Sequence, residues 1–216
     1  MNLPFTTEQF LKVFEVYNQA VWPMQIAFVL LALTAIGMAV YKKNYSDILI
    51  SSILAFYWLW MGIVYHLLFF TSINKAAFIF GTLFIVQGLI FVFFGVVRRE
   101  VSFLFQKNIY GLIGAALILY ALAFYPMLGF ELGHRYPQSP TFGLPCPTTI
   151  FTFGLLLWTD KRVPVVIMII PFLWSLIGFT AALKLGIKED IGLLIAGLSA
   201  SFIVVLRNFR FGGLMR

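Results

Sequence analysis

The sequence predicts an all-α integral membrane protein. We expect a seven-transmembrane-helix bundle with the N-terminus outside and the C-terminus cytoplasmic, preceded by an amphipathic interfacial helix. The 216-residue chain is 62% hydrophobic and only 11% charged, whereas soluble domains carry about 25% charged residues. The core of a single globular domain could not bury this many apolar residues. We therefore expect the outer surface of the protein to contact lipid. Two further observations support this fold class: the apolar segments have the length of membrane spans, and the basic residues lie between them.

Residues 5–21, FTTEQFLKVFEVYNQAV, are predicted to form a separate amphipathic helix. Thr6 and Gln9 have the spacing of a capping box. Phe10 and Phe14 begin an apolar series at helical spacing, with charged residues on the other faces. We expect an interfacial helix that its aromatic side chains anchor to the outer leaflet. The alternative is a lid over an outer cavity.

Seven apolar segments follow, each near the ~20 residues that cross a bilayer. None has Asp, Glu, Lys or Arg in its interior, and no linker is long enough to separate domains. We therefore expect residues 1–216 to form a single transmembrane domain. The predicted spans are 22–41, 48–70, 76–97, 108–128, 143–159, 164–183 and 190–206.

The Lys and Arg residues between the spans predict the orientation. Ten fall on one side and five on the other, and the bias alternates from loop to loop. Because the cytoplasmic side of a membrane protein carries the excess of Lys and Arg, the ten mark the cytoplasmic side. They are Lys42, Lys43, Arg98, Arg99, Lys107, Lys161, Arg162, Arg207, Arg210 and Arg216. This distribution also explains the net charge of +7 without nucleic acid, which we do not expect as a partner.

Residues 129–147 are predicted to be an extracytoplasmic capping loop. This polar, proline-rich stretch ends in PCPTT. Pro147 suits the first position of a helix, which would place Cys146 at the N-cap. A helix N-terminus can lower the pKa of a thiol, so Cys146 could be reactive or bind metal. The alternative is a small cysteine packed as a hydrophobic residue at the start of a short span.

The polar residues that are not cytoplasmic anchors gather in the outer half of the predicted bundle. His66 is in the outer third of its span, Gln87 lies near the middle, and Gln25 lies at an outer end. Polar groups that converge in this way predict an outward-facing pocket. The predicted ligand-binding residues are His66, Glu131, His134, Cys146, Tyr136, Thr148, Gln87 and Gln25.

A transition-metal site is one hypothesis for this pocket, because imidazole, thiolate and carboxylate are ligands for zinc or copper. Its predicted ligands are His66, His134, Cys146 and Glu131. Each has an alternative interpretation. His66 could be a neutral histidine satisfied by one hydrogen bond. Glu131 could form a surface ion pair with Arg135, since Gly133 and Pro137 disfavour a regular helix there.

The segments MNLPFTTEQFLKVFEVYNQAVWP and GHRYPQSPTFGLPCPTTIFTFGLLL resemble an uncharacterised family of bacterial multipass membrane proteins, classed as a domain of unknown function. The resemblance runs along most of the chain. It implies a multipass protein of the bacterial cytoplasmic (inner) membrane and implies no activity or site residues.

These observations favour a protein that binds or transports a small solute or metal ion in the lipid bilayer. One alternative is a membrane enzyme in which Cys146 is the nucleophile and His134 or His66 the base. The other is a structural or accessory subunit of an oligomer or a complex, which the 18% aromatic content suggests. The single cysteine excludes an internal disulfide.

Overall fold

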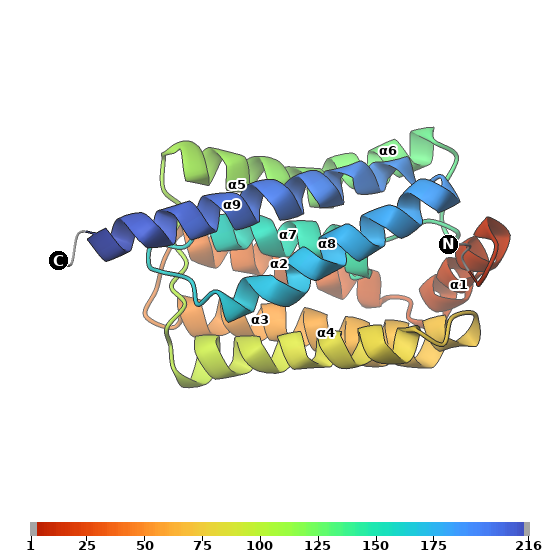
Figure 1. Ribbon diagram of the computed structural model, residues 1–216, viewed down its shortest axis with the longest axis horizontal. Helices are drawn as coiled ribbons and strands as arrows, with labels where there is room; N and C mark the ends of the chain where they lie inside the picture. The colour runs from red at the N-terminus through yellow and green to blue at the C-terminus, as the bar shows by residue number, and fades with distance from the viewer. Residues whose placement is uncertain (1–3, 214–216) are drawn as a thin grey trace.

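A computed structural model describes residues 4–213, and side chains as far as Phe209. Over this range the chain consists of helices and loops, with two isolated β-bridges and no strand (Figure 1). The α-helices are α1 (Thr7–Ala20), α2 (Met24–Val40), α3 (Ser46–Trp60), α4 (Ala77–Phe91), α5 (Ile109–Leu119), α6 (Tyr125–Glu131), α7 (Pro145–Leu157), α8 (Val166–Leu185) and α9 (Ile191–Gly213).

Three helices continue into π-helical stretches, in which the wider turn changes the direction of the side chains. These stretches are η1 (Met61–Phe69) after α3, η3 (Val92–Val97) after α4 and η4 (Tyr120–Phe124) between α5 and α6. Two short 3₁₀ turns, η2 (Phe70–Ser72) and η5 (Lys188–Asp190), lie at helix ends. The stretch η1 carries Tyr65 and His66, and η5 carries two acidic residues.

Five continuous helical segments are long and apolar enough to cross a membrane. They are Ser46–Ser72, Ala77–Val97, Ile109–Glu131, Val166–Leu185 and Lys188–Phe209. A sixth is obtained if α1 and α2, which meet at 83°, count as one broken span. The chain is therefore an all-helical bundle with five or six helices compatible with a bilayer.

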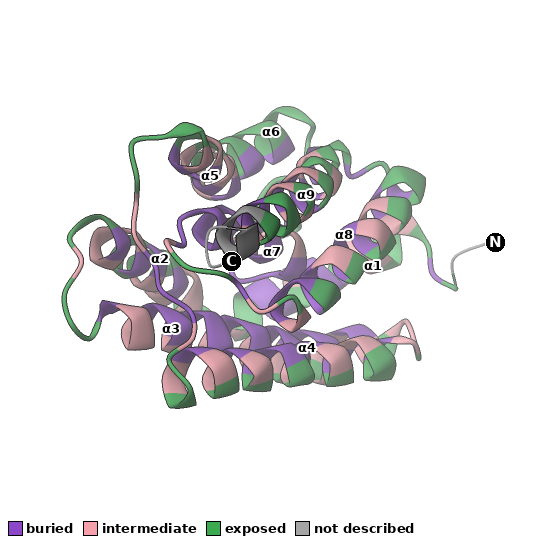
Figure 2. Cartoon of the chain, turned by 60° about the vertical axis from the view of Figure 1, so that its left-hand side comes forward, coloured by how far each residue is buried: buried purple, intermediate pink, exposed green. Residues whose placement is uncertain are grey.

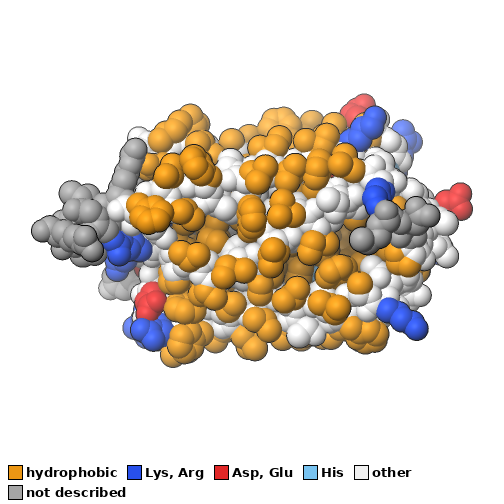
Figure 3. All heavy atoms as spheres, viewed as in Figure 1, with side chains coloured by type: hydrophobic (Ala, Val, Ile, Leu, Met, Phe, Trp, Pro, Cys, Tyr) orange, Lys and Arg blue, Asp and Glu red, His pale blue; other side chains and the backbone are white. Residues whose placement is uncertain are grey.

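Helix α1 lies across one end of the bundle (Figure 1). The predicted capping box is confirmed, because Thr6 Oγ1 accepts from the Gln9 amide at 3.2 Å and Gln9 Oε1 accepts from the Thr6 amide at 2.9 Å. We call this end the α1 end and the other, where α9 leaves the bundle, the C-terminal end. Hydrophobic side chains cover the middle of the face in Figure 3, and charged side chains gather at both ends.

Helix α7 is the central helix of the bundle. All its residues except Cys146 are buried (Figure 2). Its thirteen residues span about 20 Å, less than the ~30 Å of a hydrocarbon core. The neighbouring helices shield it from lipid, so it need not match the bilayer thickness. Gly114 of α5 and Gly154 of α7 allow close packing, since a Cβ on Gly154 would lie 2.9 Å from the Gly114 carbonyl oxygen.

Charged side chains close the C-terminal end. Arg207, which is 5% exposed, donates to the carbonyls of Leu156 and Leu157 at 3.2 and 3.0 Å, and also to the Thr159 hydroxyl. It therefore satisfies carbonyls at the end of α7 that lack helical partners. Nearby, Lys42 Nζ lies 3.3 Å from an Asp47 oxygen and 3.5 Å from one of Asp160.

Candidate functional site

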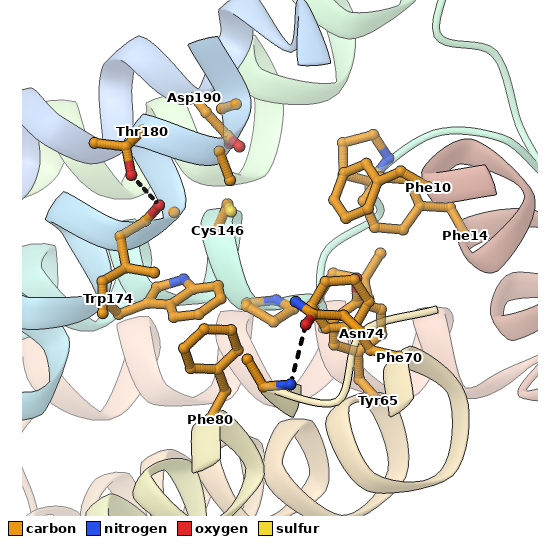
Figure 4. Close-up of a pocket in the computed structure, with 18 of the residues that line it drawn as sticks. Phe10, Phe14, Tyr65, Phe70, Asn74, Phe80, Cys146, Trp174, Thr180 and Asp190 are labelled. Carbon is orange, nitrogen blue, oxygen red and sulfur yellow. Dashed lines mark hydrogen bonds between the residues drawn. The ribbon is translucent and has the colours of Figure 1, made fainter. Parts of the chain in front are cut away.

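A cavity of about 410 Å³ lies at the α1 end (Figure 4). Phe10 and Phe14 of α1 lie on one side of it, with Cys146 and Asp190 opposite. Trp174 of α8 and Phe80 of α4 form another wall. The cavity is thus enclosed by helices far apart in the sequence.

Eight of the residues that line the cavity are aromatic, and several of their rings also pack on one another. The rings of Phe10 and Phe14 are 4.6 Å apart, centroid to centroid, and Phe10 meets Phe70 edge-on at 5.8 Å. Tyr65 stacks on Phe70 at 5.7 Å. These separations lie within the favourable range for aromatic pairs, so the wall is held in place without a ligand.

The polar part of the cavity is built around Asp190. Helix α8 ends at Gly186, whose φ of 77° is left-handed, and the chain then returns through η5. This turn directs the Asp190 side chain into the bundle, where it is 5% exposed. The Tyr125 hydroxyl donates to Asp190 Oδ1 at 2.5 Å, and the Cys146 thiol lies beside the same carboxyl. A thiol, a phenol and a carboxyl therefore meet at one side of an aromatic cavity.

Glu189, the residue before Asp190, is fully buried and faces a different partner. His134 Nδ1 lies 2.8 Å from Glu189 Oε1, and the Tyr120 hydroxyl donates to the Glu189 carbonyl at 2.6 Å. Gly129 makes room for the carboxylate, because a Cβ there would lie 3.1 Å from Oε1. His134 thus connects the 132–144 loop to η5 and does not line the cavity.

His66 lies in an aromatic cage behind the cavity wall. It is fully buried, and neither ring nitrogen has a hydrogen-bond partner. Its ring centroid is 4.6 Å from that of Phe84 and 5.3 Å from that of Trp174, whose indole lines the cavity. The single hydrogen bond of the alternative interpretation is not formed. His66 does not itself line the cavity but packs behind four rings that do, those of Tyr65, Phe70, Phe80 and Trp174.

Other predicted site residues connect loops and helices outside the cavity. Gln25 Nε2 donates to the Asn18 carbonyl at 3.0 Å, and the Tyr136 hydroxyl contacts the same oxygen at 3.4 Å. Gln87 Nε2 donates to the Ile167 carbonyl at 3.0 Å, and Thr148 Oγ1 accepts from the Gly143 amide at 3.0 Å. Of the eight predicted residues, the structure places only Cys146 on the cavity wall.

The sequence did not identify Asn18, which attaches α1 to the 132–144 loop. Asn18 is fully buried, and its Nδ2 donates to the carbonyls of Pro137 and Ser139 at 2.7 and 2.9 Å. The Thr141 hydroxyl donates to Asn18 Oδ1 at 2.8 Å. Farther along α1, hydrogen bonds from Lys12 and Gln138 lower the pKa of Glu15. These contacts hold α1 over the cavity.

The four predicted metal ligands do not come together. Glu131 is exposed at the end of α6, His134 pairs with Glu189, and His66 is enclosed by rings. Among the residues that the structure describes, no group of three His, Cys, Asp or Glu side chains could hold a metal ion. The geometry therefore provides no support for the transition-metal hypothesis.

Two local predictions are corrected. Cys146 is not the N-cap of α7, because the helix begins two residues earlier, with Leu144 as N-cap and Pro145 as its first residue. The fixed φ of Pro145 suits this position as well as that of Pro147 does. Within the described part of the chain, Glu131 forms no ion pair with Arg135. The Arg135 guanidinium lies over the Phe130 ring, 4.8 Å from its centroid.

Asp190, Tyr125 and Trp174 line the cavity but were not among the residues predicted from the sequence. Asp190 follows Glu189 in a short link before an apolar helix. Acidic residues at such a position ordinarily stabilise the N-terminus of the helix while they stay exposed at the surface. The burial of Glu189 and Asp190 results from tertiary packing, which the local sequence does not show. Tyr125 and Trp174 resemble the many other aromatic residues of the spans.

The chain belongs to a family of unknown function (DUF6064), whose sequence profile matches residues 7–213. No curated protein and no solved structure matches it.

Proposed function

We propose that this protein crosses a bacterial cytoplasmic membrane seven times, with its N-terminus outside, and binds or transports a small solute in the cavity at the α1 end. Helices α2, α3, α4, α5 with α6, α7, α8 and α9 are the seven crossings. The alternation of basic loops supports this orientation. In it, α1 is an interfacial helix that also covers the cavity, and residues 129–147 cap the bundle outside.

The cavity carries this proposal. Its volume of about 410 Å³ lies within the 300–1,000 Å³ typical of small-molecule sites. Its walls are mainly aromatic and apolar, and the polar groups of Tyr125, Cys146 and Asp190 converge on it from α6, α7 and η5. A pocket of this kind encloses the apolar body of a ligand and orients one polar group. Metal binding is the less favoured form of the proposal.

The single cysteine provides a direct test. A membrane-impermeant maleimide added to intact cells should alkylate Cys146, because the cavity faces outward in the proposed orientation. With purified full-length protein, phenylpropanol should slow this alkylation, whereas glycerol at the same concentration should not. Tryptophan emission gives a second measure of occupancy through Trp174. Labelling only after the membrane is made permeable would contradict the orientation, and no protection would contradict the solute site.

A membrane enzyme is the second candidate, because the Cys146 thiol faces the cavity beside a carboxyl. In this geometry the base would be Asp190, since neither His134 nor His66 lines the cavity. Thiolate formation would move the thiol proton to Asp190. This candidate predicts fast alkylation of Cys146 at neutral pH and much slower alkylation in Asp190→Asn. Slow alkylation of the wild type, unchanged by the substitution, would leave solute binding as the function.

A further inference from the structure

We propose that the cavity selects organic cations: solutes with an aromatic or aliphatic body and an ammonium group that Asp190 binds. This inference rests on the proposed solute site and specifies the chemical class of its ligand.

The first argument is the set of partners around Asp190. The carboxyl is almost fully buried, yet the side chains that hydrogen-bond to it are the neutral hydroxyl of Tyr125 and the neutral thiol of Cys146, and the adjacent Glu189 is also acidic. At the α1 end, the ion pairs among described residues are Lys12 with Glu15 and His134 with Glu189, and neither includes Asp190. A buried carboxylate is costly unless a cation pairs with it. A ligand ammonium in the cavity would supply that charge.

The second argument is the chemistry of the walls. Tyr65, Phe80 and Trp174 line the same cavity as Asp190 (Figure 4). The faces of aromatic rings attract cations, most strongly for Trp, and the attraction grows when the pair is removed from water. An anion would meet the carboxylate of Asp190 and the negative faces of the rings. Both features therefore favour the same sign of ligand charge.

Lys184 is the one basic residue among the described residues that line the cavity. Its side chain is exposed, whereas Asp190 is buried. Water and salt screen an exposed charge far more than a buried one. The charge that acts most strongly on an enclosed ligand is therefore that of Asp190.

Three probes of matched shape test the inference: phenylpropylammonium, phenylpropanol and phenylbutanoate. Each is titrated against Cys146 alkylation and tryptophan emission of the purified full-length protein. We expect phenylpropylammonium to protect at a concentration about tenfold lower than phenylpropanol, and phenylbutanoate to protect least. Asp190→Asn should remove this tenfold preference, so that phenylpropylammonium and phenylpropanol protect at similar concentrations. Asp160→Asn, a matched change at the C-terminal end, should leave the preference intact.

Equal protection by the ammonium and the alcohol would overturn cation selectivity and leave the solute site standing. Strongest protection by phenylbutanoate would also overturn it, and would show that Lys184 selects an anionic ligand. Protection by none of the three would contradict the proposed function itself. If Asp190→Asn does not fold, Asp190→Glu keeps the charge and should retain the preference, and its loss there would count against the inference.

Discussion

The two ends of the bundle differ in the partners of one buried charged residue, Arg207 at the C-terminal end and Asp190 at the α1 end. At the C-terminal end, Arg207 is buried but donates to two carbonyls and a hydroxyl, and Lys42 lies between two aspartates. At the α1 end, Glu189 pairs with His134, whereas Asp190, which is as buried as Arg207, is hydrogen-bonded by the neutral Tyr125 hydroxyl and borders a cavity. Among the residues that the structure describes, no ion pair includes Asp190, which is why we propose it as the group that binds a cationic ligand.

Helix α7 connects these two environments. Its first turn carries Cys146 to the cavity, and its last turn ends at the Arg207 guanidinium. The rest of the helix is fully enclosed. If the comparison is right, substitutions at the C-terminal end should change stability and leave the cavity unchanged, and those at the α1 end should change access or binding.

The largest loss of stability is expected for Arg207→Ala. The substitution removes the donor to the Leu157 carbonyl and the Thr159 hydroxyl in a buried site, and it leaves the Leu156 carbonyl with the Thr159 hydroxyl as its remaining donor. Lost charge-assisted hydrogen bonds of this kind cost about 3 kcal/mol in total. Thermal unfolding in detergent measures the loss, with Arg98→Ala as a control because Arg98 is exposed, where its ion pair with Glu100 and its contact with the Phe93 ring contribute little. Equal effects of the two variants would contradict the role assigned to Arg207.

Asn18→Ala should have the next largest effect, and it should appear as access to the cavity. The change removes the donor to Pro137 and Ser139 and the acceptor for Thr141, at a cost of about 2 kcal/mol. We expect α1 to detach from the loop more often and Cys146 alkylation to quicken by about tenfold. Gln19→Ala is the control, because its side chain is exposed one position away. An unchanged rate for Asn18→Ala would show that α1 does not limit access.

The helical layout could be predicted from the sequence because each apolar run is bounded by charged or proline-containing links. The central position of α7 could not, since an apolar run reads the same whether lipid or protein surrounds it. The residues of the candidate site were harder to predict from the sequence than the helices. Cys146, Tyr125 and Asp190 lie on three elements whose side chains meet only after packing. His134 and Glu131 were predicted to share a metal site, and the fold pairs His134 with Glu189 instead.

His66→Phe should slightly increase stability, in contrast to the two substitutions above. Both imidazole nitrogens are buried without partners, so replacing the ring with an apolar one of similar shape relieves a desolvation cost. We expect a gain of about 1 kcal/mol in the free energy of unfolding, reduced by any crowding against Phe84. Protection of Cys146 by phenylpropanol should be unchanged. Lost protection in a stable variant would show that His66 contributes to the cavity after all.

Glu131→Gln should have the smallest effect, although the sequence placed Glu131 in the site. Its side chain is exposed at the end of α6, so the change in stability should stay within about 0.5 kcal/mol. Glu189→Gln is the matched comparison, since Glu189 is fully buried against His134. We expect a loss of about 2 kcal/mol there, because the charge-assisted hydrogen bond is weakened. If Glu131→Gln were the more damaging of the two, the carboxylate that orients His134 would be that of Glu131, and the pairing of His134 with Glu189 at the α1 end would be wrong.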